Sequence, residues 1–233
     1  TDWKRFLMNR PYEPWDPRKY LEYRLFWPYS SGIPGQWMAH QIDTVHWFSG
    51  LQYPRSAVAN GGIYMWNDGR TNYDTVTAVL DYGDSKEKVP GNGFQVIYSS
   101  RQNNSSGGTK EWYFSNGGKL DLDTNVVSSE GGLTERYAAE MGMKPFLLEP
   151  FELPQIKVET GSNTGSDPLT NAHMKNWMDC VRANNLKTNA PVEAGYSHSI
   201  ADIMVTAALR TGQRATFDET TKQVMAGGKI FKY

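Results

Sequence analysis

The spacing of apolar residues changes twice along the chain, from helical to alternating and back to helical. Between Gln36 and Ser49 apolar side chains recur at helical intervals, at Trp37, Met38, Ile42, Val45 and Phe48. Gly50 follows as a stop for the helix. This pattern predicts a helix over Gln36–Ser49, entered from the turn-rich segment Ser30–Gly35.

The segment before this helix is aromatic and broken by prolines, which stand at positions 11, 14, 17 and 28. Proline fixes φ and cannot donate a helical hydrogen bond. We therefore expect residues 1–30 to form an irregular arm with one short helix near Pro17–Phe26.

Between Arg55 and Leu122 the pattern is typical of strands separated by turns. The β-branched or aromatic runs predict the strands Ser56–Trp66, Tyr73–Asp81, Gly93–Ser100, Lys110–Phe114 and Gly118–Leu122. Asn116-Gly117 is a strong signal for a two-residue hairpin between the last two. Connections this short join antiparallel neighbours. Gly61-Gly62, inside the first run, indicates a bulge or a close backbone contact.

Helical spacing returns towards the C-terminus. Residues 124–168 are poorly patterned and predict a long excursion with one strand near Gln155–Glu159. A helix is predicted over Ala172–Ala183, with Thr170 or Asn171 as its N-cap. Its apolar face consists of Met174, Trp177, Met178 and Val181.

A second helix is predicted over Ala194–Thr211, with Gly212 as its stop. The remaining Ala215–Lys232 is expected to be a strand or a tail that packs on the sheet. The order of helix, antiparallel meander and two helices predicts an α+β layer fold in a single domain over residues 1–233.

Composition narrows the classes of function. The 24 Lys and Arg nearly balance the 25 Asp and Glu, and no basic tract supports a nucleic-acid or anionic-membrane partner. Apolar stretches are far shorter than the ~20 residues of a membrane span. Cys180 is the single cysteine, so no disulfide forms within the chain. Aromatic residues reach 13%, and their rings pack in the core or form platforms for sugar rings.

The chain contains no phosphate-binding motif. A dinucleotide site needs G-x-G-x-x-G between a strand and a helix, so that backbone N–H groups reach the pyrophosphate. Gly91-Asn92-Gly93 lacks the third glycine and precedes a predicted strand. We therefore expect any nucleotide cofactor to be held by another domain.

Histidines are the next candidates for chemistry. His40, Asp43 and His46 follow each other at intervals of three, so the two imidazoles drift apart around the helix and make a poor metal pair. No metal site is therefore expected. The remaining histidines, His173 and His198, are expected to pack or to cap helices.

Gln36 and His40 share one helix face because they are four residues apart. His40 stands among apolar neighbours, so it is either a satisfied core residue or a general acid/base that faces a cleft. Spacing alone leaves both interpretations open.

Three segments resemble the C-terminal half of the Gfo/Idh/MocA oxidoreductase family, which includes glucose–fructose oxidoreductase and inositol dehydrogenase. The first, Tyr29–Asp43, resembles a glycine turn followed by the family's D-x-x-x-H-x-x-D. The second runs from Gly61-Gly62-Ile63-Tyr64 through Asp68-x-Arg70 to Asp74-Thr75. The third is His173-x-x-Asn176-Trp177-x-Asp179-Cys180-Val181-Arg182 and then Ala190-Pro191-Val192-Glu193-x-Gly195. Secreted and environmental bacterial members are the most similar.

The resemblance implies a large, mostly antiparallel, open-faced sheet with helices on one face and an oligomer interface on the other. It also implies an N-terminal Rossmann domain that binds NAD or NADP and lies before Thr1. In this chain His40 takes the place of the family's catalytic histidine, and Gln36 replaces its aspartate. The further expected substrate contacts are Tyr29, Arg24, Asp43 and Trp47.

The implied function is the substrate side of an NAD(P)-dependent oxidoreductase that acts on a sugar, polyol or related carbohydrate. The alternatives are a non-catalytic carbohydrate-binding or oligomerisation module and an NAD-dependent glycosidase of the same family. The expected partners are a carbohydrate substrate, the chain's own Rossmann domain and further copies of the chain. Cytoplasmic and exported locations stay open, because a targeting signal would lie upstream of Thr1.

Overall fold

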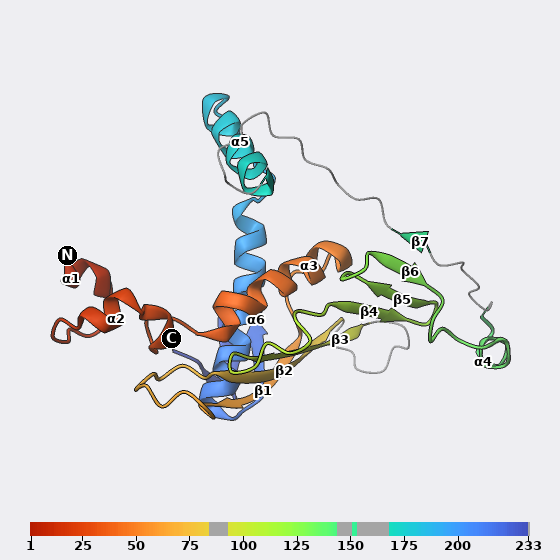
Figure 1. The fold of residues 1–233 in the computed structure, drawn as a ribbon, viewed down its shortest axis with the longest axis horizontal. Helices are drawn as coiled ribbons and strands as arrows, with labels where there is room; N and C mark the ends of the chain where they lie inside the picture. Colours follow the sequence, from red (N-terminus) through yellow and green to blue (C-terminus); the bar gives the residue numbers. More distant parts are fainter. Residues whose placement is uncertain (84–92, 144–150, 153–167, 233) are drawn as a thin grey trace. The chain divides into compact units, whose positions relative to one another are not determined.

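The computed structural model describes residues 1–83, 93–143, 151–152 and 168–232. These residues form an α+β fold with antiparallel sheets, as the pattern predicts (Figure 1). Two compact units are present, one comprising Thr1–Asn104 with Val192–Tyr233 and the other Ser105–Pro191. The sequence predicts one domain over the whole chain. The division into two compact units does not test that prediction.

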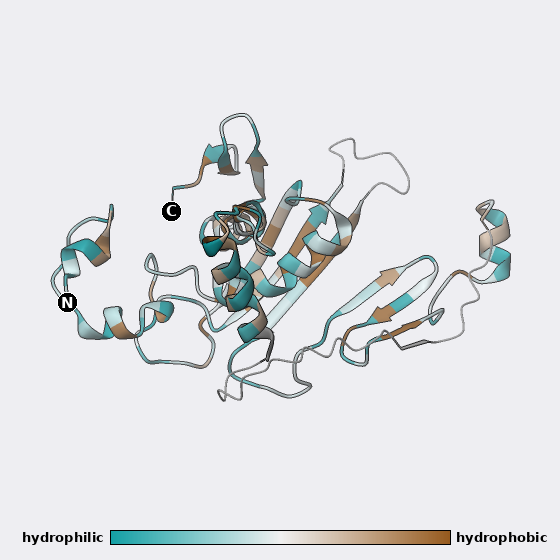
Figure 2. Cartoon of the chain, turned by 90° about the horizontal axis from the view of Figure 1, so that it is seen from above, coloured by the Kyte–Doolittle hydropathy of each residue, from teal (hydrophilic) through white to brown (hydrophobic). Residues whose placement is uncertain are grey.

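A six-stranded antiparallel sheet is the centre of the first unit, in the order β10-β9-β8-β1-β2-β3. The bounds of its strands are β1 Ser56–Gly62, β2 Thr75–Tyr82, β3 Phe94–Arg101, β8 Ala215–Asp218, β9 Gln223–Ala226 and β10 Lys229–Ile230. The expected terminal strand or tail is therefore three short strands on the sheet. Figure 2 shows apolar residues, in brown, concentrated along the strands of this sheet.

The first strand is shorter than its apolar run predicts, because the carboxylate of Asp74 binds the backbone N–H groups that come next along the chain. Asp74 is fully buried and accepts hydrogen bonds from the N–H groups of Tyr64, Met65 and Trp66. Burial by itself raises the pKa of Asp74, but these hydrogen bonds outweigh it and hold the pKa below its usual value. Strand β1 therefore ends at Gly62.

Gly61 makes a close backbone contact, not a bulge. The register of β1 against β2 runs without interruption from Ser56↔Asp81 to Gly62↔Thr75. A Cβ at Gly61 would lie 2.5 Å from the carbonyl oxygen of Thr75.

The inner face of the sheet packs against α6, which spans Val192–Thr211 and ends at Gly212 in a left-handed conformation. Alternate β2 side chains are buried, at Val76, Ala78, Leu80 and Tyr82. Helix α3, Ala39–Ser49, packs on α6 and ends at the left-handed Gly50. A π-helical turn, η2 Pro34–Met38, leads into α3, so the predicted helix over Gln36–Ser49 is continuous but not uniform.

The N-terminal arm has more helix than the prolines suggest. The predicted short helix appears as α2 Pro17–Leu21 and the 3₁₀ turn η1 Tyr23–Leu25, and α1 Trp3–Leu7 was not predicted. Helix α1 is capped by the Asp2 side chain and is held by a cluster of packed rings, Trp3, Phe6, Trp15, Tyr20 and Tyr29. These contacts join residues that are far apart in the sequence, so the helix propensity of the local residues does not predict them.

The second unit contains a four-stranded antiparallel sheet in the order β4-β5-β6-β7. Its elements are β4 Trp112–Ser115, β5 Gly118–Asp121, β6 Val126–Ser128, α4 Glu135–Glu140, β7 Phe151–Glu152 and α5 Pro168–Arg182. The hairpin at Asn116-Gly117 is confirmed by the pairing of Ser115 with Gly118. The strand predicted near Gln155–Glu159 lies outside the described residues.

The predicted cap of α5 is wrong. The helix already begins at Pro168, a residue type that suits the first helical turn because its missing N–H is not needed there. Thr170 and Asn171 are therefore interior residues of the helix. The predicted apolar face lies at exposed positions, namely Met174, Trp177, Met178 and Val181.

A buried hydrogen-bonded chain joins α3, α6 and β2 through His46. The Ser197 hydroxyl donates to the carbonyl of Gln52, so its oxygen is left to accept from Nδ1 of His46 at 2.9 Å. Nε2 then accepts from the hydroxyl of Tyr82, also at 2.9 Å. Burial and the nearby His198 lower the pKa of His46 to about 4, against an opposing effect of Asp43. The imidazole is neutral and structural.

Burial favours the protonated form of a second group, Asp202 of α6, whereas it favours the unprotonated form of His46. Its side chain is buried, and Oδ1 has no hydrogen-bond partner among the described residues. Burial raises the pKa of Asp202 to about 8, so the carboxyl group is largely protonated at neutral pH.

Replacing His46 should remove a contribution to the free energy of unfolding that wild type loses as the pH falls. Between pH 6.5 and about 4 the unfolded chain binds a proton at His46 that the folded chain does not, so wild-type stability falls as pH falls. We expect the stability advantage of wild type over His46→Gln to shrink by roughly 3 kcal/mol from pH 7 to pH 4. Urea denaturation across this range measures it. His173→Gln, at an exposed helix position, is the control, and a pH-independent advantage would contradict the assignment.

Replacing Asp202 should have the reverse pH dependence. Between pH 4 and about 8 the folded chain retains a proton that the unfolded chain has lost, so wild-type stability at this site falls as pH rises. Asp202→Asn should therefore gain stability relative to wild type from pH 5 to pH 8 in the same denaturation series. The exposed Asp179→Asn serves as control, and an identical trend in both variants would count against a buried, protonated Asp202.

Candidate functional site

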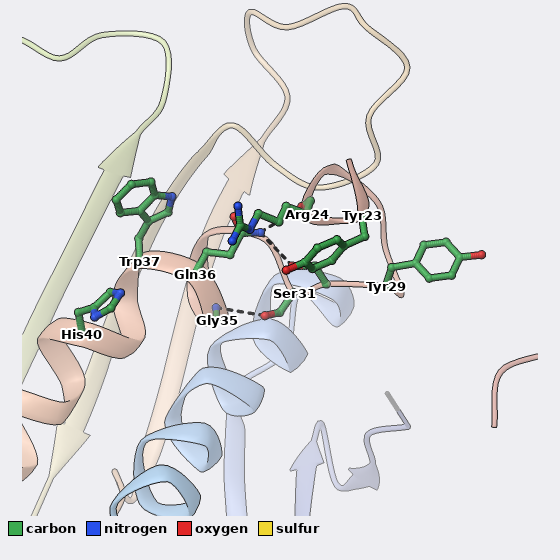
Figure 3. Close-up of a pocket in the computed structure, with 9 residues that line it drawn as sticks. Tyr23, Arg24, Tyr29, Ser31, Gly35, Gln36, Trp37 and His40 are labelled. Carbon is green, nitrogen blue, oxygen red and sulfur yellow. Dashed lines mark hydrogen bonds between the residues drawn. The ribbon is translucent and has the colours of Figure 1, made fainter. Parts of the chain in front are cut away.

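A cavity of about 530 Å³ lies at the start of the η2–α3 helix, within the first unit (Figure 3). Its lining comes from the 3₁₀ turn η1, the following loop and the first helical turns. The lining residues are Tyr23, Arg24, Tyr29, Ser30, Ser31, Gly35, Gln36, Trp37 and His40. The volume falls within the usual range of small-molecule sites.

The π-helical turn sets the direction of the side chains that enter the cavity. The N–H of Ala39 donates to the carbonyl of Pro34, five residues earlier. Gln36, within this turn, and His40, just after it, both line the cavity. Isolated π turns inside helices occur frequently at functional sites.

The glycine turn before the helix is required by the backbone. Gly32 has φ 71°, in the left-handed region, and a Cβ there would lie 3.0 Å from Cβ of Asn72. A side chain at this position would be strained and would also press on Asn72. The glycine thus lets the loop approach the β1–β2 connection closely.

Asn72 holds the wall of the cavity in place. Its amide is buried and donates to the carbonyls of Arg24 and Ser30, both at 2.9 Å. Its oxygen accepts from the guanidinium of Arg210 at 2.6 Å, and that guanidinium lies over the ring of Trp27. Both ends of the loop that lines the cavity are therefore fixed to the body of the first unit.

Gln36 braces the same loop. Its Nε2 donates to the hydroxyl oxygen of Ser30 at 2.9 Å and to the carbonyl of Arg24 at 3.2 Å. A carbonyl only accepts, so the nitrogen must face it and the orientation of the amide is fixed. The oxygen Oε1 of Gln36 has no partner among the described residues and can accept from a ligand hydroxyl.

His40 is exposed, so the interpretation of a satisfied core histidine is wrong for this residue. The buried histidine of the helix is His46, two turns later. The His40 ring makes no hydrogen bond with the described residues and lines the cavity beside Gln36. It is free to exchange a proton with a bound ligand or with solvent.

The other expected contacts divide into two groups. Arg24 and Tyr29 line the cavity, although Figure 3 shows the Tyr29 ring pointing away from Gln36, where it stacks with rings of the arm. Asp43 and Trp47 do not line it. Asp43 faces Nδ1 of His198 at 3.5 Å, and Trp47 is 79% exposed farther along α3. Substrate contact by any of these four residues stays a prediction.

Several residues at the site were not predicted. Trp37 is 55% exposed and lines the cavity three residues before His40, a spacing that could have suggested a shared face. Tyr23, Ser30 and Ser31 also line it. Asn72 is more than 30 residues away in sequence, and no local pattern connects it to the cavity.

The start of the cavity helix does not fit a dinucleotide phosphate, and the described residues contain no cluster of metal ligands. No group of three or more His, Cys, Asp or Glu side chains converges within the described part of the chain. At the start of the helix the N–H of Gly35 donates to the hydroxyl oxygen of Ser31, and that of Gln36 donates to the carbonyl of Gly32. These N–H groups are therefore not available to a pyrophosphate. Gly91 and Asn92 lie outside the described residues.

The chain matches no protein-family model, no curated protein and no solved structure. None of the helices in the described residues combines the length and the apolar character needed to cross a bilayer.

Removing the Asn72 amide should destabilise the cavity wall. Asn72→Ala removes three hydrogen bonds and leaves the carbonyl of Ser30 without its donor, and we expect a loss of roughly 2 to 4 kcal/mol in the free energy of unfolding. Urea denaturation measures it, with the exposed Asn60→Ala of β1 as control. Equal stability of the two variants would show that Asn72 does not anchor the wall.

Proposed function

We propose that the chain is the substrate-side domain of an NAD(P)-dependent oxidoreductase of the Gfo/Idh/MocA family, acting on a sugar, polyol or related carbohydrate. The observation that carries the proposal is the exposed imidazole of His40, which lines a cavity beside Gln36 and has no partner among the described residues. The sequence motif around these residues resembles that of the family.

The proposed chemistry uses His40 as the proton acceptor. Removing a hydride from a carbon that bears a hydroxyl group requires a base for the hydroxyl proton, and a neutral imidazole is suited to this task. Gln36 would orient the hydroxyl through Oε1, because its nitrogen is already engaged with the loop. As an uncharged residue, Gln36 gives no charge stabilisation to a protonated His40. The proton would instead leave through the solvent that reaches the exposed ring.

NAD or NADP belongs to this proposal only through another domain. The start of the cavity helix offers no phosphate cradle for a dinucleotide, because its N–H groups are used within the turn. In the proposal a Rossmann domain of the same protein binds the cofactor.

We also propose that copies of the chain associate through the outer face of the six-stranded sheet. Val58, Val79 and Ile97 are in register across β1, β2 and β3 and form an apolar row on this face. Val58 is 37% and Ile97 is 72% exposed, so the row includes two exposed apolar side chains, which are more informative than a single exposed one. A second copy would cover this row.

A carbohydrate-binding module without catalysis is the second candidate, and Gln36 favours it. The family's acid is replaced by an amide that braces the loop, so the site retains its shape without an acidic group beside His40. Such a module would bind carbohydrate in this cavity without turnover.

His40→Ala in the full-length protein distinguishes these functions. For an oxidoreductase we expect kcat to fall by about 10²- to 10⁴-fold because the base is lost, with carbohydrate affinity nearly unchanged. Reduction of NAD and NADP with a panel of sugars and polyols measures turnover, and His173→Ala is the control. An unchanged kcat in His40→Ala would overturn the assignment of the base. Carbohydrate binding with no turnover in wild type would support the binding module.

A further inference from the structure

The charge of the cavity is unbalanced. Of its lining residues, Arg24 carries the permanent charge, and no Asp or Glu is among them. The guanidinium of Arg24 makes no hydrogen bond or ion pair with the described residues. It lies over the ring of Tyr23, 5.6 Å from the centroid, and the residue is exposed.

Carboxylates that could neutralise Arg24 are engaged elsewhere. Glu22, two residues away, bonds the Arg18 guanidinium at 2.6 Å. Asp68 pairs with Arg70 at 2.8 Å. The cavity therefore has no internal counter-ion for Arg24 in the described part of the chain.

Other arginines near the site have partners, which makes Arg24 different. Arg10 donates to the carbonyl of Pro28, and Arg210 donates to Asn72. Arg18 and Arg70 hold carboxylates, as above. An unneutralised guanidinium that lines a cavity can pair with a planar anion through two parallel N–H groups.

The backbone of Arg24 is fixed while its side chain is free. Its carbonyl accepts from Asn72 at 2.9 Å and from Gln36 at 3.2 Å. The ring of Tyr23 supports the guanidinium by a cation–π contact, which leaves the N–H edge able to bind an anion. The group is thus positioned without being neutralised.

We infer that the cavity binds an acidic sugar, whose carboxylate pairs with Arg24. This inference rests on the proposed carbohydrate function of the cavity and specifies its substrate class. A carboxylate suits the site better than a phosphate, because one guanidinium supplies a single positive charge and a planar pair of donors. The N–H groups of Gly35 and Gln36, which could assist a phosphate, are used within the turn.

The arrangement also orients the sugar. In Figure 3 the side chains of Arg24 and Gln36 overlap in the view, while the His40 ring stands apart from them, farther along the helix. A carboxylate held at Arg24 is thereby kept away from the imidazole, and the hydroxyl groups of the ring face Gln36 and His40. The anion fixes the orientation of the ligand and the uncharged groups contact its hydroxyls.

Matched pairs of sugars test the inference on the 233-residue chain. D-glucuronate and D-galacturonate are titrated against their uncharged counterparts D-glucose and D-galactose by calorimetry, with the His40 ring signals followed by NMR. We expect the acids to bind about tenfold more tightly at low ionic strength and to lose this preference as salt is added. Arg24→Gln should abolish the preference, so that the acidic and the neutral sugars bind equally tightly.

Two further variants control the result. Arg24→Lys keeps the charge without the planar fork and should retain part of the preference. Arg5→Gln removes an exposed arginine of α1 and should change nothing. Circular dichroism checks that each variant is folded, and Arg24→Lys together with the salt series still decides the question if Arg24→Gln does not fold.

The outcomes separate this inference from the proposed function. Equal binding of acidic and neutral sugars, or a preference that survives Arg24→Gln, would overturn the acid site and leave the carbohydrate function standing. Inorganic phosphate bound as tightly as the sugar acids, with loss in Arg24→Gln, would show a general anion site and overturn the assignment of the sugar. Binding of none of the four sugars would count against both proposals.

Discussion

The buried amide of Asn72 is the contact on which the site depends. Through three hydrogen bonds it connects two loop carbonyls, at Arg24 and Ser30, to Arg210 near the end of α6. Without it the carbonyl of Ser30 would lose its donor, and the carbonyl of Arg24 would keep only the longer bond from Gln36. The cavity is thus a consequence of how the N-terminal arm is attached to the sheet and helix of the first unit.

The elements that depend on local pattern could be predicted from the sequence. Apolar spacing indicated α3 and α6, and turn residues indicated the antiparallel hairpins. The predicted elements were wrong where a side chain distant in the sequence, and not the local pattern, determines whether an element forms or where it ends. Strand β1 stops at Gly62 because Asp74 binds the next N–H groups, and α1 exists because its rings pack against rings from elsewhere in the arm.

The candidate site was predictable in part, for the same reason. The motif drew attention to Gln36 and His40, but helical spacing could not say which of two histidines faces solvent. That distinction depends on the position of α6, whose Ser197 bonds His46 and leaves His40 exposed. The role of Asn72 depends on a contact across more than 40 residues, which one sequence does not reveal.

The separation of anchors from lining residues has a consequence for how the surface of the cavity can vary. The groups that fix the wall, such as Asn72 and the glycine at position 32, are buried, whereas Tyr23, Arg24 and Trp37 are exposed at the cavity. Substitutions in the exposed set change the chemistry of the cavity surface at little cost to folding, since surface substitutions usually alter stability only slightly. The lining can therefore vary at three positions while the buried anchors keep the shape of the cavity.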